Sequence, residues 1–225
     1  MQFTPIWFIT LGVLTASVLA IVFLAKLISK PVDSYAFSFK RMFPFEVVNH
    51  NEKGLPYKIL LCVFVAASFA PLFNLFTSYG RTANVEAISI AICCVYGFAA
   101  LCFAFLHYFD ATHTMAHLLL FILFLCLTLL GNALATIKGI AVFNAYAKHD
   151  QKMYCSLIGG IICGACALVG VIMSVNPKLK NWAALERANN EVVRPKVFIL
   201  AFYEWLTFFL LAIGEISYFL ILLAQ

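Results

Sequence analysis

Charged residues are scarce in this chain: they make up 11% of its 225 residues, whereas apolar residues make up 64%. Soluble proteins usually carry about a quarter charged residues. The mean hydropathy of the chain is +0.98. This composition excludes an ordinary soluble protein and indicates an integral membrane protein.

The chain contains several long apolar runs. A helix needs roughly 20 residues to cross a hydrocarbon core of ~30 Å. Six runs are this long, at about residues 5–28, 57–78, 84–106, 114–137, 153–175 and 197–223. We therefore predict an all-α fold, a polytopic bundle of six transmembrane helices. The connections are loop-sized, so residues 1–225 are expected to form a single domain.

Further absences narrow the function. The first run has no basic n-region and is longer than the roughly 7–15 residues of a signal-peptide core, so we expect it to remain as the first span. The sequence has no repeat, no Gly-rich phosphate loop, no nucleic-acid-binding module and no N-x-S/T sequon. The net charge of +5 then predicts membrane lipids with anionic headgroups as partners, and no nucleic acid.

The cysteines predict neither a disulfide framework nor a cofactor site. All eight fall within the six runs or at an edge of one, where cysteine usually acts as a small apolar residue. The CGAC sequence at 163–166 has CxxC spacing, but it lies among small residues of an apolar run. Gly160 and Gly164 in this run form a GxxxG pair, which predicts close packing against another helix.

Basic residues are distributed unevenly between the two ends of the predicted bundle. The end that carries the connections after the first and fifth spans holds 11 of the 15, and the other end holds only Arg81, Lys138, Lys148 and Lys152. Lysine and arginine favour the cytoplasmic side. The count predicts that the two long connections are cytoplasmic and both termini are not.

Three connections have informative sequences. SYAFSFKRMFPFEVVNH in the first connection places aromatic residues beside basic ones, which is typical of the headgroup boundary; it lies either along the membrane surface or packed on the bundle. Residues 138–152 are half apolar, so the fourth helix is expected to continue beyond the membrane. WAALERANNEV in the fifth connection is compatible with a helix and forms either a docking surface or a solvated loop.

Two acidic residues, Glu204 and Glu215, lie inside the sixth run. Eleven helical residues make three turns and about 20°, so the two carboxyls share one face roughly 16 Å apart and cannot form one catalytic dyad. An acid inside the membrane costs about 2.5–3.5 kcal/mol and normally faces the bundle interior, paired or protonated. Candidate partners are Asn74, one turn after Pro71 in the second run, Asn132 in the fourth, and the hydroxyls of Thr128, Thr207 and Ser217.

Three of the five histidines gather in HYFDATHTMAH, residues 107–117. On one continuous helix, Asp110, His113 and His117 would share a side and suit a transition metal. Residues 84–137 are too long for one span, however, and this is the polar place where the chain can turn. We favour a turn in which Asp110 or Thr112 caps the next helix and His107 closes the previous one. Proton transfer and metal binding are the alternatives; HxxxH without HExxH is a weak metal signal, and we predict no metal.

Three places resemble one family of membrane proteins: Pro44-Phe45 with Pro56 before the second span, Asp110 with His113 before the fourth, and Glu204-Trp205 early in the sixth. With the six-span layout, they resemble the DRAM/FRAG/SFK family, which includes damage-regulated autophagy modulators, a factor for remodelling GPI anchors, and scaffolds for a phosphatidylinositol 4-kinase. Val48-Asn49-His50-Asn51 replaces a Ser-Asp-x-Gly-like centre of the family. The resemblance implies a place in endomembranes or the plasma membrane and a first connection outside or in the lumen, opposite to the charge count.

Three hypotheses about function follow. The first is a non-enzymatic multi-pass protein that modulates lipid organisation or membrane trafficking, or scaffolds partners at the membrane. The second is an accessory subunit of a larger membrane complex. The third is a transporter or membrane enzyme that uses the intramembrane glutamates and the histidines.

Overall fold

The computed structural model describes residues 5–28, 37–49, 54–79, 87–109, 114–146, 153–177, 186–188, 191–193 and 197–223. Six of the described helices are long and apolar enough to cross a membrane, which confirms the predicted fold class. They are α1 (Pro5–Ile28), α3 (Gly54–Tyr79), α4 (Ala87–Leu106), α5 (Thr114–Tyr146), α6 (Met153–Ser174) and α7 (Ile199–Leu223). Between α1 and α3 lies the short helix α2 (Pro44–Asn49).

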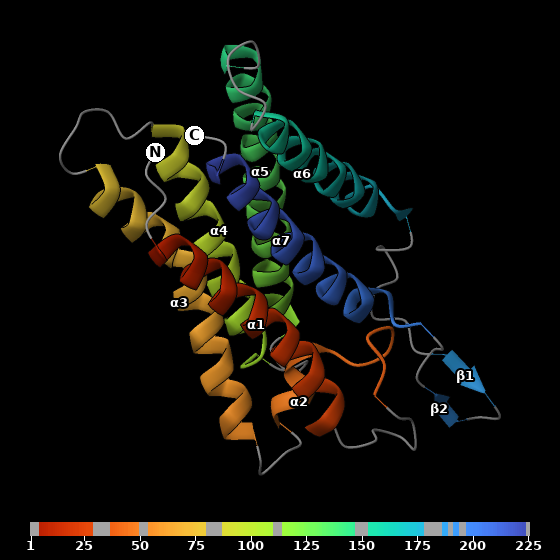
Figure 1. Cartoon of the computed structure of the whole chain (residues 1–225). Coiled ribbons are helices and arrows are strands. Elements are labelled where there is room, and N and C mark those ends of the chain that lie inside the picture. Colours follow the sequence, from red (N-terminus) through yellow and green to blue (C-terminus); the bar gives the residue numbers. More distant parts are fainter. Residues whose placement is uncertain are drawn as a thin grey trace.

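The helix boundaries follow the apolar runs closely, except at the end of α5. This helix continues to Tyr146, about nine residues beyond the predicted end of the fourth span, as the half-apolar sequence after it predicted. Pro71 lies inside α3, and Figure 1 shows the axis of α3 changing direction along its middle part. A mid-helix proline removes a backbone hydrogen bond and bends a helix, so Pro71 explains this bend.

Helix α7 forms the centre of the bundle (Figure 1). In an apolar 18-residue window of α7, 67% of the window is buried inside the protein. In the corresponding windows of the other five spans, the buried share is 33–50%. Helices α1, α4, α5 and α6 all contact it. Its two glutamates are therefore placed where several helices can supply partners.

Helices α5 and α6 approach closely through glycines. A Cβ atom on Gly139 would lie 2.8 Å from the Cα of Gly160, and one on Gly164 would lie 3.4 Å from the side chain of Thr136. The Ser156 hydroxyl donates a 2.9 Å hydrogen bond to the carbonyl of Gly139. The Gly160 and Gly164 pair thus faces α5, and Gly139 completes the contact.

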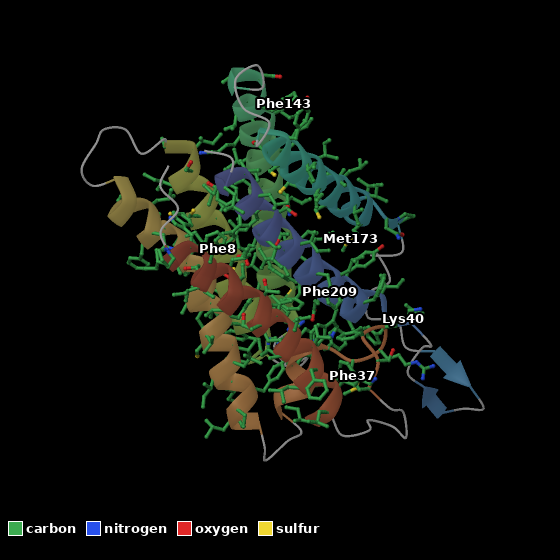
Figure 2. The ribbon with its side chains drawn as sticks, viewed as in Figure 1. Phe8, Phe37, Lys40, Phe143, Met173 and Phe209 are labelled. Carbon is green, nitrogen blue, oxygen red and sulfur yellow. The ribbon has the colours of Figure 1, made fainter. Side chains whose placement is uncertain are left out.

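Residues 37–47 of the first connection pack on the bundle, which is one of the two arrangements that the sequence left open for this segment. The backbone N–H of Phe198 donates to the Lys40 carbonyl at 2.7 Å, and the Trp205 indole N–H donates to the Met42 carbonyl at 2.9 Å. The Phe39 ring packs edge-on against Trp205 and Phe209, with ring centroids 4.9 and 5.6 Å apart. Figure 2 shows Lys40 of this segment beside the N-terminal end of α7. We call residues 37–47 the docked segment.

Helix α2 begins within the docked segment because its first residues form a cap. Pro44 suits the first turn of a helix, where no N–H is needed. The Glu46 carboxylate accepts a 2.8 Å hydrogen bond from the N–H of Phe43, the residue before the helix. This is one half of a capping box, so the short helix holds Phe43, Phe45 and Glu46 in fixed positions.

The fifth connection contains a short β-hairpin, where the sequence was interpreted as compatible with a helix. Strands β1 (Glu186–Ala188) and β2 (Glu191–Val193) pair antiparallel, with Ala188 opposite Glu191. Val192 and Val193 in β2 are β-branched, and such residues favour strands. The helical interpretation is wrong at these strands.

Candidate functional site

A short polar contact between distant parts of the chain joins His117 to Glu204. His117 lies in the first turn of α5 and Glu204 near the start of α7, and the imidazole Nε2 is 2.6 Å from the carboxyl Oε1. His117 is 3% exposed and Glu204 is 0% exposed. His117 therefore reaches across from α5 to the sixth span.

The Phe109 carbonyl fixes the position of one hydrogen on the His117 ring. Its Nδ1 is 2.8 Å from the carbonyl oxygen of Phe109, and a carbonyl only accepts, so Nδ1 carries a hydrogen. The hydrogen bond to Glu204 then contains one proton, either on Nε2 facing a carboxylate or on the carboxyl facing a neutral ring. In both forms the pair is neutral as a whole, which suits a buried membrane position.

The docked segment covers this pair. The rings of Phe43 and Phe45 stand nearly perpendicular to the His117 ring, with centroids 5.9 and 5.5 Å away. Glu46 is buried beside them. No hydrogen-bond partner for the Glu204 Oε2 atom is found among the described residues. The His117 and Glu204 pair is thus enclosed within the protein. The segment that covers it belongs to a connection and not to a spanning helix.

His107 lies at the C-terminal end of α4 and has its own set of partners. Its Nδ1 donates to the Phe103 carbonyl at 2.9 Å, so its Nε2, 3.1 Å from Tyr57 Oη, accepts from that hydroxyl. Burial lowers the pKa of the His107 imidazole to about 4, and the bond to Phe103 only partly offsets this effect. His107 is therefore neutral and closes α4, and it joins α4 to α3 through Tyr57.

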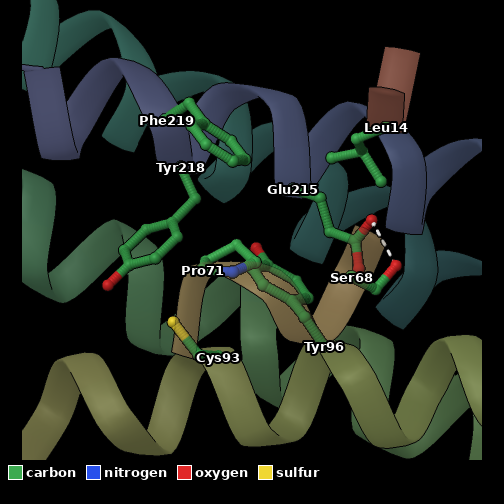
Figure 3. A pocket seen from close by; sticks show the side chains of 8 residues that line it. All are labelled: Leu14, Ser68, Pro71, Cys93, Tyr96, Glu215, Tyr218 and Phe219. Carbon is green, nitrogen blue, oxygen red and sulfur yellow. Dashed lines mark hydrogen bonds between the residues drawn. The ribbon is translucent and has the colours of Figure 1, made fainter. Parts of the chain in front are cut away.

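Glu215 contacts α3, at a different position from Glu204. Its Oε2 is 3.2 Å from the Ser68 hydroxyl, and Ser68 is also 3.0 Å from the carbonyl of Phe64. Figure 3 shows the Glu215 carboxyl and Ser68 beside a cavity that Pro71, Tyr96 and other side chains line. The volume open to the centre of a water molecule is about 10 Å³, room for roughly one water.

Counting hydrogens indicates which form of Glu215 fits this contact. A serine hydroxyl has one hydrogen, and Ser68 is within reach of two acceptors. When Glu215 is protonated, its O–H donates to Ser68 and Ser68 donates to Phe64, so both bonds form at once. A carboxylate would compete with Phe64 for the single hydrogen. The arrangement favours the neutral acid expected for a buried carboxyl in a membrane.

This assignment predicts that Glu215→Gln changes the free energy of unfolding by less than about 1 kcal/mol, because an amide N–H can replace the carboxyl O–H as donor to Ser68. Glu215→Leu, which removes the donor, is expected to cost more. Denaturant unfolding in detergent measures both variants. A glutamine variant as unstable as the leucine variant would contradict the neutral form.

The two amides lie in separate contacts. Asn132 donates to the carbonyls of Thr128 and, across the helix interface, Leu210, at 2.9 and 3.4 Å, and accepts from Tyr96 Oη at 3.2 Å. A Cβ at Gly214 would collide with the Asn132 amide oxygen, so this glycine allows α7 to meet the amide. Asn74 donates to the Thr10 hydroxyl on α1 at 2.9 Å. These are bonds between helices.

Sequence reasoning missed one charged residue inside the bundle. Lys138 was assigned to the connection after the fourth span, but it lies within α5 and is buried, with its ammonium group in a hydrogen bond to the Ser89 hydroxyl of α4. The apolar run ends at residue 137, so a hydropathy window ends the span there even though the helix continues.

The remaining predicted site residues, Asp110 and His113, lie outside the described residues. Among the residues that are described, no three His, Cys, Asp or Glu side chains form a group able to hold a metal ion. Of the predicted set, the structure joins His117 to Glu204 but gives Glu215, Asn74, Asn132 and His107 other partners. Ser68, Tyr57 and Glu46 were not predicted, because single polar residues in apolar or loop sequence give no distinctive signal.

Comparison of the chain with protein-family models, with curated protein sequences and with solved structures gives no match.

Proposed function

We propose that this chain is a non-enzymatic multi-pass membrane protein that modulates the organisation or traffic of membrane lipids, or holds partners at the membrane. The observation that carries the proposal is that both intramembrane acids are buried and bonded to neighbouring helices. Glu204 bonds to α5 and Glu215 to α3. Acids used in this way join helices, and they are not presented to a substrate.

The space around each acid supports a non-catalytic role. Beside Glu215, the cavity of about 10 Å³ has room for roughly one water and cannot hold a lipid headgroup or a sugar. Glu204 is covered by the rings of the docked segment through its partner His117. A general acid or base must come within hydrogen-bond reach of its substrate, and neither carboxyl has that access.

The outer surface supports contact with lipid. Large apolar side chains are exposed along the spans, for example Leu19, Phe23, Leu119 and Ile172. The resemblance to the DRAM/FRAG/SFK family points toward lipid handling and trafficking. On this basis we place the protein in endomembranes or the plasma membrane.

Purification in a mild detergent tests the proposal. We expect a chain that carries bound phospholipid enriched over the bulk membrane, measured by mass spectrometry of extracted lipids, and that does not convert added phospholipids. A stoichiometric protein partner with no enriched lipid would instead identify an accessory subunit. Lipid turnover, or proton flux in sealed vesicles that Glu204→Gln abolishes, would overturn the non-enzymatic assignment.

The orientation of the chain in the membrane is predicted from the distribution of its basic residues alone. We expect Lys40→Cys to react with a membrane-impermeant thiol reagent only after the plasma membrane is selectively permeabilised, because 11 of the 15 basic residues lie at that end of the bundle. Lys40 is exposed and uses only its backbone to bind Phe198, so the substitution preserves the fold. The wild-type chain, with its eight cysteines, is the control. Labelling in intact cells, or no labelling even after selective permeabilisation, would support the orientation implied by the family resemblance.

A further inference from the structure

The small cavity beside Glu215 borders a buried polar atom. Its walls come from α1, α3, α4 and α7 and include Glu215, Ser68, Pro71 and Cys93. Ser68 contacts the Oε2 atom of Glu215, and Figure 3 shows the other carboxyl oxygen on the side where Tyr96 lines the cavity. Glu215 is 4% exposed. No hydrogen-bond partner for its Oε1 atom is found in the part of the chain that the structure describes, so this atom can bind a ligand in the cavity.

The bend of α3 supplies a second acceptor at this cavity. In an α-helix, the carbonyl of residue 67 receives its hydrogen bond from the N–H of residue 71. Residue 71 is a proline and has no N–H, so the Ala67 carbonyl loses this donor. Ala67 is buried, and Ser68 and Pro71, which flank its carbonyl group, both line the cavity. In transmembrane helices, carbonyls freed by a proline are satisfied by neighbouring side chains or by ordered water.

The hydrogens at the cavity determine what kind of ligand fits. In the neutral form of Glu215, the carboxyl O–H donates to Ser68, so Oε1 is a carbonyl oxygen that only accepts. The Ala67 carbonyl also only accepts. A ligand between two acceptors must donate two hydrogen bonds, and water has two hydrogens. The volume of about 10 Å³ open to the centre of a water molecule is enough for one and for nothing larger.

We propose that this cavity binds one ordered water molecule, which donates to Glu215 Oε1 and to the Ala67 carbonyl and so links α7 to the bend of α3. Ser68 then satisfies one oxygen of the Glu215 carboxyl, and the water satisfies the other. A buried polar group without a partner is costly, so this water stabilises the bent conformation of α3. The site requires the neutral form of Glu215 and is independent of any role in lipid organisation.

Infrared difference spectra of the full chain in detergent test the site. Subtracting the spectrum of Glu215→Gln from that of the wild type isolates the C=O stretch of the neutral Glu215 carboxyl, and a hydrogen bond to Oε1 lowers the frequency of this band. Cys93→Val fills the cavity and leaves Glu215 and Ser68 in place. Measured against its own Glu215→Gln background, Cys93→Val should shift the band to higher frequency, because the valine displaces the water. It should also lower the denaturant midpoint, whereas filling a dry cavity would raise the midpoint.

Cys102→Val is the matched control, because Cys102 is buried on the same helix and lies outside the cavity wall; it should leave the band unshifted. An unshifted band in Cys93→Val, an equal shift in both variants, or a higher denaturant midpoint for Cys93→Val would overturn the water site. A wild-type spectrum without a Glu215 carboxyl band would show a carboxylate and overturn it as well. If Cys93→Val does not fold, Leu14→Phe fills the cavity from α1 and decides the question by the same band.

Discussion

Replacing Trp205 by alanine is expected to lower the free energy of unfolding by about 3–5 kcal/mol, the range for removing a large buried aromatic side chain. Trp205 is fully buried and packs against Phe39, Phe103 and other rings. It also donates a hydrogen bond to the Met42 carbonyl. The substitution therefore weakens the bundle and releases the docked segment, and denaturant unfolding in detergent measures the first effect.

Limited trypsin digestion measures the second effect, because the docked segment contains the basic pair Lys40-Arg41. We expect Trp205→Ala to be cut there under native conditions more rapidly than the wild type. Trp7→Ala is the matched control: Trp7 is equally buried, but it packs on Phe219 in a different part of the bundle. Equal cleavage of the two variants would mean that trypsin reports general loosening and that Trp205 does not hold the segment.

Removing one partner of the His117 and Glu204 pair is expected to cost about 3–5 kcal/mol, because the other partner stays buried without its hydrogen bond. His117→Leu and Glu204→Leu should each show this loss. The double variant should be much less unstable than the sum of the two, since both polar groups are then gone. A double-mutant cycle in denaturant measures this coupling. Additive losses would contradict a direct interaction.

Glu204→Gln separates hydrogen bonding from charge. The Nδ1 hydrogen of His117 is fixed by the Phe109 carbonyl, so a neutral ring presents a lone pair at Nε2, and the glutamine amide can donate to it. We expect a loss of only about 1 kcal/mol. A loss as large as that of Glu204→Leu would show that the pair must exist as imidazolium and carboxylate.

The six spans were predictable because hydropathy depends only on local composition. The same holds for Gly160 and Gly164, whose spacing brings both onto one helix face. The partner glycine, Gly139, was not predictable, since it belongs to a different helix and its pairing depends on how α5 and α6 cross. Local sequence predicts which residues share a face of a helix. Which residues of another helix contact that face depends on the tertiary arrangement.

The contacts of the candidate site were likewise predictable only in part. That Glu204 and Glu215 face the interior follows from the cost of burying an acid in lipid, and their separation along α7 follows from helix geometry. Their actual partners, His117 and Ser68, are 87 and 147 residues away in sequence. The position of Lys138 was misjudged for another reason: its helix continues after the apolar run ends, and Ser89 gives its ammonium group a buried partner.

The bonds between the docked segment and α7 also bear on the order of biosynthesis. Met42, Lys40 and His117 emerge from the ribosome before the residues that bind them, which all belong to α7 or directly precede it. The first connection therefore cannot reach its final position until this helix has entered the membrane. When it enters, Glu204 finds an imidazole already in place. Insertion of α7 thus completes the nascent bundle, so a ribosome stalled before residue 197 is expected to leave a chain that quality-control proteases recognise.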